Sequence, residues 1–170
     1  MCVCALGLCG AQKESEGFDA ARCTAFVNDM TADPLSNHVE PGSIDVCLLI
    51  FVLSAINPDK MLHSLQNLAF VMKPGGLVLF RDYGIYDMAE IRMAEQKGHR
   101  IADNFYVRKD GTRAYYFSEE VLQRLFEEAG FAVQELKMHK RVVRNRKEHA
   151  DMHRRWVQGT FVKSEGVVSL

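Results

Sequence analysis

The sequence predicts an α/β domain built on a largely parallel sheet with helices packed on its faces. Residues 44–53 form an almost continuous apolar run, which is typical of a parallel-sheet strand buried on both faces. A helical pattern follows from Asn57, and a second apolar run occupies residues 77–80. The order strand, helix, strand indicates a right-handed crossover between two parallel strands. Ligands of such folds bind in the crevice beyond the carboxyl ends of the strands.

Local sequence patterns predict the segments before the crossover and the two ends of its helix. Residues 24–27 are expected to be a short strand, and residues 31–41, which are polar with two prolines, a loop. Asn57 and Pro58 are typical of the N-cap and the first position of a helix. Residues 73–76, Lys-Pro-Gly-Gly, are expected to end that helix and turn the chain.

The second half of the chain predicts two helices, a hairpin and two neighbouring antiparallel strands. In order, these are a helix at 88–95, a hairpin of 105–108 with 113–117, a helix from 118 to 129, and strands at 131–143 and 156–162. The aromatic runs around Asp110 and Gly111 are a strong hairpin signal. Ser118 is a typical helix N-cap, and Gly130 is a typical residue just after a helix end.

Length, composition and charge restrict the function classes. With 170 residues, 48% of them hydrophobic and 25% charged, the chain has the size and composition of one soluble domain. Its net charge of −1 hides an asymmetry, because residues 137–155 carry an excess of six positive charges over an acidic remainder. Such a segment indicates a polyanionic partner or, equally, a solvated basic face.

The cysteines and the first residues bear on the compartment. The odd number of cysteines, 5, contains no Cys-x-x-Cys pair and indicates a reducing compartment; Cys23 and Cys47 are expected to be buried thiols. We therefore expect a cytoplasmic location, with the nucleus as the alternative. Residues 1–17 are expected to be irregular, ahead of a domain at 18–170, and they resemble neither a membrane span nor a signal peptide. The pair His149 and His153 has no third ligand, so we expect no metal.

Two carboxylates follow predicted strands and are candidates for chemistry. Asp29 ends the run at 24–27, where an acid in nucleoside-binding folds often accepts a hydrogen bond from the adenine amino group or a ribose hydroxyl. The alternative is a helix cap or a solvated loop residue. Asp82 ends the second crossover strand, where its carboxylate is expected to face the crevice. The alternative is an ion pair with Arg81 or Arg113.

Aromatic and arginine side chains are concentrated between residues 81 and 117. This segment holds Tyr83, Tyr86, Phe105, Tyr106, Tyr115, Tyr116 and Phe117, interleaved with Arg81, Arg92, Arg108 and Arg113. Such a set can stack on an unpaired base and clamp its phosphates. The alternative is that they serve the core or pair across the hairpin, which we expect of most of the aromatic residues.

From about Phe18 to Lys163 the chain resembles the tRNA 3-methylcytidine methyltransferases, a methyltransferase-like group of class I S-adenosylmethionine (SAM) enzymes. The Lys-Pro-Gly-Gly motif is shared across SAM methyltransferases and is weak support. The specific signal is a set of motifs in one order, which are Phe80-Arg81-Asp82-Tyr83-Gly84, Asn104-Phe105-Tyr106-Val107-Arg108 and Asp110-Gly111-Thr112-Arg113. Residues 22–29, 50–56 and 155–158 match the family as well.

The resemblance implies a Rossmann-like class I methyltransferase fold, SAM as cofactor and a cytidine of the tRNA anticodon loop as acceptor. By motif, Asp29 would bind the adenosine part of SAM, Met30 would line the adenine pocket and Ile50 would contact the cofactor. Asp82 and Tyr83 would be the catalytic residues beside the target base. Five arginines are candidates for RNA contact, namely Arg81, Arg108, Arg113, Arg144 and Arg155. Family members can also work with an aminoacyl-tRNA synthetase such as the seryl enzyme.

The sequence departs from the family at its start. The family's first strand with its Glu-x-Gly-x-Gly-type loop, and its second strand ending in an acid, have no counterpart that we can identify. We therefore expect an incomplete fold with an open apolar edge beside the strand at residue 44. Two hypotheses follow. The chain is a SAM-dependent tRNA methyltransferase, or it is a catalytically inactive remnant that serves as an RNA- or protein-binding module.

Overall fold

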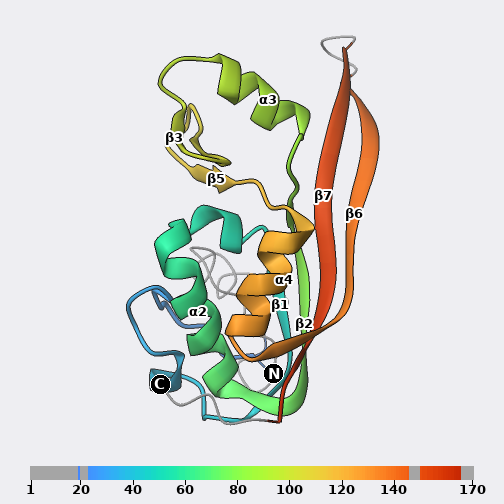
Figure 1. Ribbon diagram of the computed structural model, residues 1–170. Coiled ribbons are helices and arrows are strands. Elements are labelled where there is room, and N and C mark those ends of the chain that lie inside the picture. The colour runs from blue at the N-terminus through green and yellow to red at the C-terminus, as the bar shows by residue number, and fades with distance from the viewer. Residues whose placement is uncertain (1–18, 20–22, 146–149, 166–170) are drawn as a thin grey trace.

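The computed structural model describes Asp19 and residues 23–145 and 150–165, which form a four-stranded and a three-stranded sheet. The large sheet has the strand order β1-β2-β7-β6, and helices α2 and α4 lie together on one face of it (Figure 1). This mixed architecture confirms the predicted α/β class. The predictions for residues 1–17 and for His149 lie outside the described residues.

The crossover of β1 (Ile44–Ile50), α2 (Pro58–Val71) and β2 (Met72–Tyr83) forms as predicted, with β1 and β2 parallel. The Asn57 side chain caps α2 by accepting a hydrogen bond from the Asp59 amide at 3.3 Å. Residues 73–76 end the helix but do not form a separate turn. They bulge out of the first part of β2, since Ile44 pairs with Met72 while Val46 pairs with Leu77.

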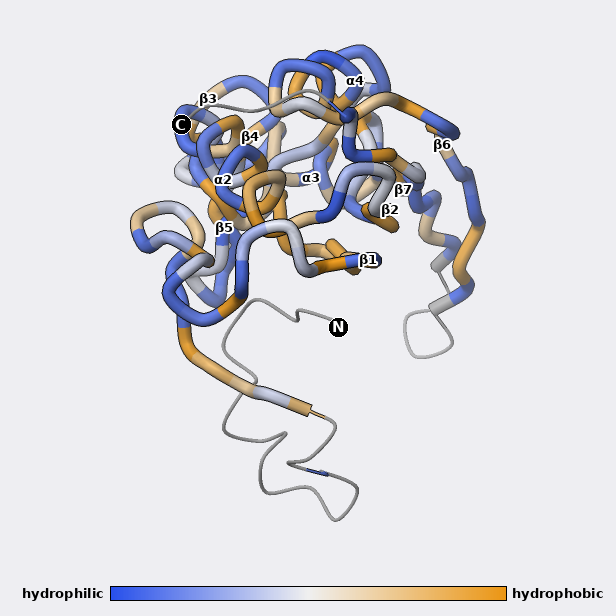
Figure 2. Tube along the Cα trace, turned by 90° about the horizontal axis from the view of Figure 1, so that it is seen from below, coloured by the Kyte–Doolittle hydropathy of each residue, from blue (hydrophilic) through white to orange (hydrophobic). Residues whose placement is uncertain are grey.

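β1 lies at an edge of the large sheet, and one of its two faces is exposed. Val46, Leu48 and Ile50 keep 37%, 40% and 46% of their surface accessible, so the predicted burial on both faces is wrong for the described residues. The strand also ends at Ile50, and a short 3-10 helix, η2 (Leu53–Ala55), follows it. Figure 2 shows the hydrophobic colour of β1 on the open side of the sheet, as expected for an uncovered edge.

The other half of the large sheet is a long antiparallel ribbon of β6 (Phe131–Asn145) and β7 (Ala150–Lys163). Both strands are longer than predicted, and the ribbon extends well beyond the rest of the sheet (Figure 1). The helix α4 (Glu119–Glu128) precedes β6, and the Ser118 hydroxyl accepts from the Val121 amide at its start, as predicted. Gly130 then leaves the helix with a φ of +90°.

A small subdomain joins β2 to α4. It consists of α3 (Met88–Glu95) and a sheet of β3 (Arg100–Ala102), β4 (Phe105–Val107) and β5 (Arg113–Tyr115). The predicted hairpin is confirmed as the pair β4 and β5, with Gly111 at a φ of +82° in its turn. Tyr106, Ala114 and Tyr116 form a separate core beneath this sheet.

The main core lies between the large sheet and the helices α2 and α4. Phe80 of β2 is at its centre, with ring centroids 6.0 Å from Phe117, 5.5 Å from Phe126 and 6.1 Å from Phe161. Phe126 and Phe161 stack at 3.6 Å, which joins α4 to β7. This aromatic cluster anchors the carboxyl end of β2, where the candidate site begins.

The predicted strand at residues 24–27 does not form, because in the described part of the chain no neighbouring strand pairs with it. Val27 is 87% exposed, and Cys23, expected to be buried, is exposed as well. Cys47 on β1 is buried as predicted. After residue 30 the loop holds one 3-10 turn, η1 (Leu35–Asn37).

Candidate active site

The candidate site lies where β1 and β2 end, and Asp82 is at its centre. The Asp82 side chain is fully buried; it accepts hydrogen bonds from the Ser54 amide and from its neighbour, the Tyr83 amide, each at 2.9 Å. The carboxylate was expected to face the crevice; in the structure it is closed off from solvent, and the Ser54 amide of η2 bonds to it. The alternative ion pair with Arg81 or Arg113 is not found among the described residues either.

Burial makes Asp82 an unusual carboxylate. Loss of water raises its pKa from 3.8 to about 6, although hydrogen bonds from Ser54 and Tyr83 and the positive charge of Arg108 oppose the rise. The group thus changes its charge within the range where many enzymes work. In the part of the chain that the structure describes, no cation forms an ion pair with its negative form.

Tyr83, the residue after Asp82, is half-buried, so part of the candidate site is exposed to solvent at this side chain. Its ring centroid lies 4.8 Å from that of Phe51 and 5.6 Å from that of Tyr116, and the Arg108 guanidinium carbon lies 4.7 Å from it. Phe51 has a φ of +56°, which is unusual for a bulky residue. Its amide donates to the Arg81 carbonyl at 2.8 Å, which holds the Phe51 backbone beside the end of β2.

The other predicted RNA-binding arginines are in different settings. Arg81 lies over the Trp156 ring at 4.9 Å, and Arg155 lies over Tyr86 at 5.4 Å. Arg113 is exposed at the start of β5. Arg144, on the ribbon, pairs with Asp151 at 3.2 Å; the Arg144 side chain is largely exposed and that of Asp151 about half exposed. Of the five predicted arginines, Arg108 therefore lies at the candidate site. The other four arginines lie on β2, on the small sheet and on the ribbon.

The three predicted cofactor residues differ in accessibility. Asp29 is exposed and accepts from the Thr31 amide at 3.0 Å; hydrogen bonding by Thr31 lowers the Asp29 pKa. Ile50 is 46% exposed at the end of β1. Met30 is buried in the core, and its carbonyl accepts from the Asn67 side chain at 3.2 Å. Asp29 thus caps a local turn, in line with the alternative weighed for it, while its position leaves it open to solvent.

Neither a metal site nor a membrane-spanning helix occurs in the described ranges. No group of three or more His, Cys, Asp or Glu side chains there could hold a metal ion. No helix among them is long and apolar enough to cross a bilayer.

Residues 6–136 match the family described as Methyltransferase domain. The chain belongs to this methyltransferase family. Solved structures support the class I SAM-dependent methyltransferase fold. A SAM-dependent methyltransferase from Anabaena variabilis has a TM-score of 0.60 at 13% identity, over 90% of this chain and 62% of that one. A Burkholderia thailandensis 1,6-didemethyltoxoflavin-N1-methyltransferase, solved with S-adenosylhomocysteine, has a TM-score of 0.51 at 18% identity, over 79% and 50%.

Curated relatives are far closer in sequence to this methyltransferase domain. The tRNA N(3)-cytidine methyltransferase METTL6 of Pongo abelii is 46% identical over 153 residues, which is 89% of this chain and 53% of that protein. The human tRNA N(3)-cytidine methyltransferase METTL2B is 45% identical over 89% of this chain and 39% of its own length. O-methyltransferase 3 of Dictyostelium discoideum is 45% identical over 89% and 35%. The chain thus spans between about a third and a half of these relatives.

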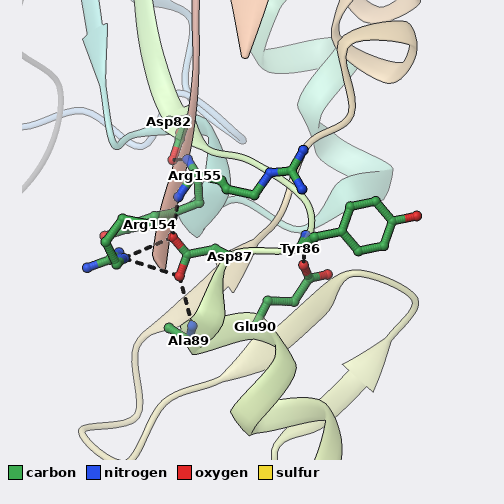
Figure 3. Close-up of polar contacts among 8 residues, drawn as sticks. Asp82, Tyr86, Asp87, Ala89, Glu90, Arg154 and Arg155 are labelled. Atoms are coloured by element: carbon green, nitrogen blue, oxygen red, sulfur yellow. Dashed lines mark hydrogen bonds and ion pairs between the residues drawn. The ribbon is translucent and has the colours of Figure 1, made fainter. Parts of the chain in front are cut away.

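Sequence reasoning missed a second buried carboxylate in the methyltransferase domain. Asp87 caps α3 by accepting from the Ala89 amide at 2.8 Å, and it also accepts from the Arg154 guanidinium at 2.9 Å and the Arg155 amide at 2.8 Å (Figure 3). Its place before a helix is a readable N-cap signal. Its partners on β7 are 67 and 68 residues away, and no local pattern indicates them.

Asp87 holds the small subdomain against the ribbon through Arg154. Arg154 also lines two cavities. One, of about 270 Å³, lies between Tyr86 and the basic residues Lys140, Arg141 and Arg155 of the ribbon. The other, of about 240 Å³, is lined by methionines of α3 and β7 together with three arginines, namely Arg92, Arg108 and Arg154. Arg108 is thus shared by the second cavity and the Tyr83 cluster.

Proposed function

We propose that this chain is part of a SAM-dependent methyltransferase that forms 3-methylcytidine in the anticodon loop of a tRNA. The observation that carries the proposal is the identity of 46% and 45%, over 89% of the chain, to proteins named tRNA N(3)-cytidine methyltransferases. The buried Asp82 beside a partly accessible Tyr83 supports it, since it offers a negative charge at the sheet end where this fold class places its acceptor.

The described residues fit a SAM site in part. Asp29 and Ile50 are both accessible, and they would supply a carboxylate for the nucleoside and an apolar wall. The exposed ring of Phe51 continues that wall past the end of β1. The buried Met30 fits less well, because its side chain already packs in the core. Bound SAM supplies an electrophilic methyl group on a positively charged sulfur.

Asp82 and Tyr83 would act on the acceptor base. The N3 atom of cytosine is free only when the base is unpaired, so the base must lie in a loop or be flipped out. The exposed ring of Phe51, which lies against Tyr83, would offer an aromatic surface on which such a base stacks. Methylation at N3 makes the base positive. The ionised Asp82 beside Tyr83, itself buried from water, would stabilise this growing charge electrostatically.

Exposed arginines would hold the RNA backbone. Arg113 and Arg144 are exposed and bind phosphates without losing a buried contact. Arg81 and Arg155, which lie over aromatic rings, would contact the RNA closer to the site. A seryl-tRNA synthetase partner and a cytoplasmic location stay predictions.

One experiment tests the proposal. The purified chain is first titrated with SAM by calorimetry, with Asp29→Ala as the control, and is then incubated with tRNA and SAM. The nucleosides are identified by mass spectrometry. Formation of 3-methylcytidine supports the proposal. Methylation at an oxygen, as the name of the Dictyostelium relative suggests for that protein, contradicts the assigned acceptor.

The exposed apolar face of β1 is the one observation behind a second candidate, a catalytically inactive RNA- or protein-binding module. Val46, Leu48 and Ile50 form a continuous row on an edge strand, which is an effective template for another chain. SAM binding that Asp29→Ala abolishes would count against this candidate. A folded chain that binds neither SAM nor tRNA would favour it.

A further inference from the structure

Arg108 does not sit like an RNA-binding arginine on a surface. Its guanidinium carbon lies 4.7 Å from the centre of the Tyr83 ring, and the side chain is only partly exposed. A guanidinium over an aromatic face is attracted by the negative charge of that face. Arg108 therefore has a structural partner at the candidate site, which is the residue next to Asp82.

The Tyr83 ring is enclosed from several directions. The Phe51 ring lies 4.8 Å from it at an angle of 36°, and the Tyr116 ring lies 5.6 Å from it at 41°. Phe51 comes from the loop after β1, while Tyr116 and Arg108 come from the small subdomain. Without the guanidinium, one side of the Tyr83 ring would lose its cover, and the ring could rotate away from Phe51.

The backbone of Arg108 is firmly held, so its side chain has a fixed origin. The Arg108 amide donates to the Thr112 carbonyl at 2.8 Å, and the Gly111 amide donates to the Arg108 carbonyl at 3.0 Å. These bonds close the turn between β4 and β5. The Tyr116 amide donates to the Asn104 carbonyl at 2.8 Å, which ties the far end of the hairpin. A rigid turn of this kind positions a side chain more exactly than a loose loop does.

We propose that Arg108 is a positioning residue, which fixes the Tyr83 ring beside the acceptor base and so joins the small subdomain to the methyl-transfer site. The proposal rests on the proposed function for the identity of the acceptor. The contact between Arg108 and Tyr83 and its effect on Asp82 are properties of the fold, and they are measurable without any turnover.

The charge of Arg108 also acts on Asp82. Asp82 bonds to the amides of Ser54 from η2 and Tyr83 from β2, and the charge of Arg108 from the small subdomain lowers its pKa. Around Arg108 the charged groups are Arg92 of α3 and Arg154 of β7 across the cavity, and Asp87 neutralises Arg154. Because Arg108 favours the ionised form of Asp82, its removal raises the pKa of that carboxyl further.

The test compares Arg108→Met, which removes the charge, with Arg108→Lys, which keeps a charge but not the planar group. Arg100→Met is the matched control, because Arg100 belongs to the same small sheet and pairs with Asp103 at the surface. Three readouts are taken: kcat and KM for tRNA, the pH profile of kcat, and the titration of the Asp82 carboxyl carbon by NMR in the free chain.

We expect Arg108→Met to lower kcat by roughly tenfold to a hundredfold with little change in KM, since a small misplacement of a reacting group has effects of this size. The Asp82 titration midpoint moves upward from about 6, and the acid limb of the pH profile moves with it. Arg108→Lys lowers kcat but leaves the midpoint near that of the parent. Arg100→Met leaves every readout unchanged.

Two results would overturn the proposal. If Arg108→Met raises KM while kcat and the Asp82 midpoint stay constant, Arg108 is an RNA phosphate ligand. If the chain methylates nothing, the NMR titration still decides: a midpoint that Arg108→Met does not move contradicts the role of Arg108. An upward shift in an inactive chain supports the proposed contact and places the failure in the proposed function alone.

Discussion

Asp82 and Asp87 are five positions apart in the sequence and equally inaccessible, yet their surroundings differ. Asp87 accepts from the guanidinium of Arg154 as well as from two main-chain amides. Asp82 accepts from the amides of Ser54 and Tyr83, and among the described residues no cation forms an ion pair with it. One carboxylate is thus buried with its counter-charge, and the other is buried without one.

This difference separates a structural carboxylate from a reactive one. A buried ion pair that has all its hydrogen bonds costs a great deal to break, so Asp87 holds the small subdomain to β7. A buried carboxylate without a direct cation is poised to change its charge near neutral pH, as the Asp82 pKa of about 6 indicates. Residue type and burial therefore do not by themselves distinguish a structural carboxylate from a reactive one. The presence or absence of a bonded cation does.

The largest effect on stability is expected when the Asp87 carboxylate is removed. Asp87→Ala leaves the Arg154 charge only partly solvated and unpaired and removes the α3 cap, so we expect a loss of about 3–5 kcal/mol in the free energy of unfolding. Urea titration followed by circular dichroism measures it. Asp45→Ala is the control, because Asp45 and its partner Lys73 are both well exposed, and we expect little change there. Equal effects of the two variants would contradict a structural role for Asp87.

Asp82 should show the opposite behaviour, with a stability that depends on pH. Its pKa is raised in the fold, so its contribution is most favourable below about pH 4 and is lost as the pH rises through about 6. The shift corresponds to roughly 3 kcal/mol in total. Asp82→Asn removes this term, and the difference in unfolding free energy between parent and variant should change between pH 4 and pH 7. Parallel stability curves over that range would rule the raised pKa out.

The smallest effect is expected at the surface pair of Arg144 and Asp151. The Arg144 side chain is mostly exposed and that of Asp151 is about half exposed, so Arg144→Met should change the unfolding free energy by less than about 1 kcal/mol. The same variant should weaken tRNA binding and reduce the salt dependence of the affinity, because one phosphate contact is lost. A filter-binding series over salt concentration measures this. An unchanged salt slope would remove Arg144 from the RNA-binding set.

The sequence predicted those parts of the fold whose causes are local. Asn57 and Ser118 as caps, Gly111 in the hairpin turn and the crossover around α2 all follow from short-range patterns. The strand predicted at residues 24–27 failed because a strand depends on a partner that a local pattern does not reveal. For the same reason β1, read as doubly buried, is exposed on one face.

The sequence motif predicted which residues lie at the site, but it did not predict the contacts that those residues make. Asp82 and Tyr83 do lie at the carboxyl end of β2, but the cover of Asp82 by η2 depends on how the chain turns after Ile50. The contact of Arg108 with Tyr83 arises from the docking of the small sheet, and the bond between Asp87 and Arg154 spans 67 residues. Such contacts follow from tertiary packing, which no single segment encodes.

The most direct test of the account is to measure 3-methylcytidine in tRNA treated with SAM and either the parent chain or Asp82→Asn, at pH 7.5. SAM binding is measured on the same samples. We expect the parent to form 3-methylcytidine and the variant to form about a hundredfold less, with SAM binding intact, because one electrostatic group at a reacting centre has effects of this size. Equal product from both proteins would show that the Asp82 charge has no part in the reaction.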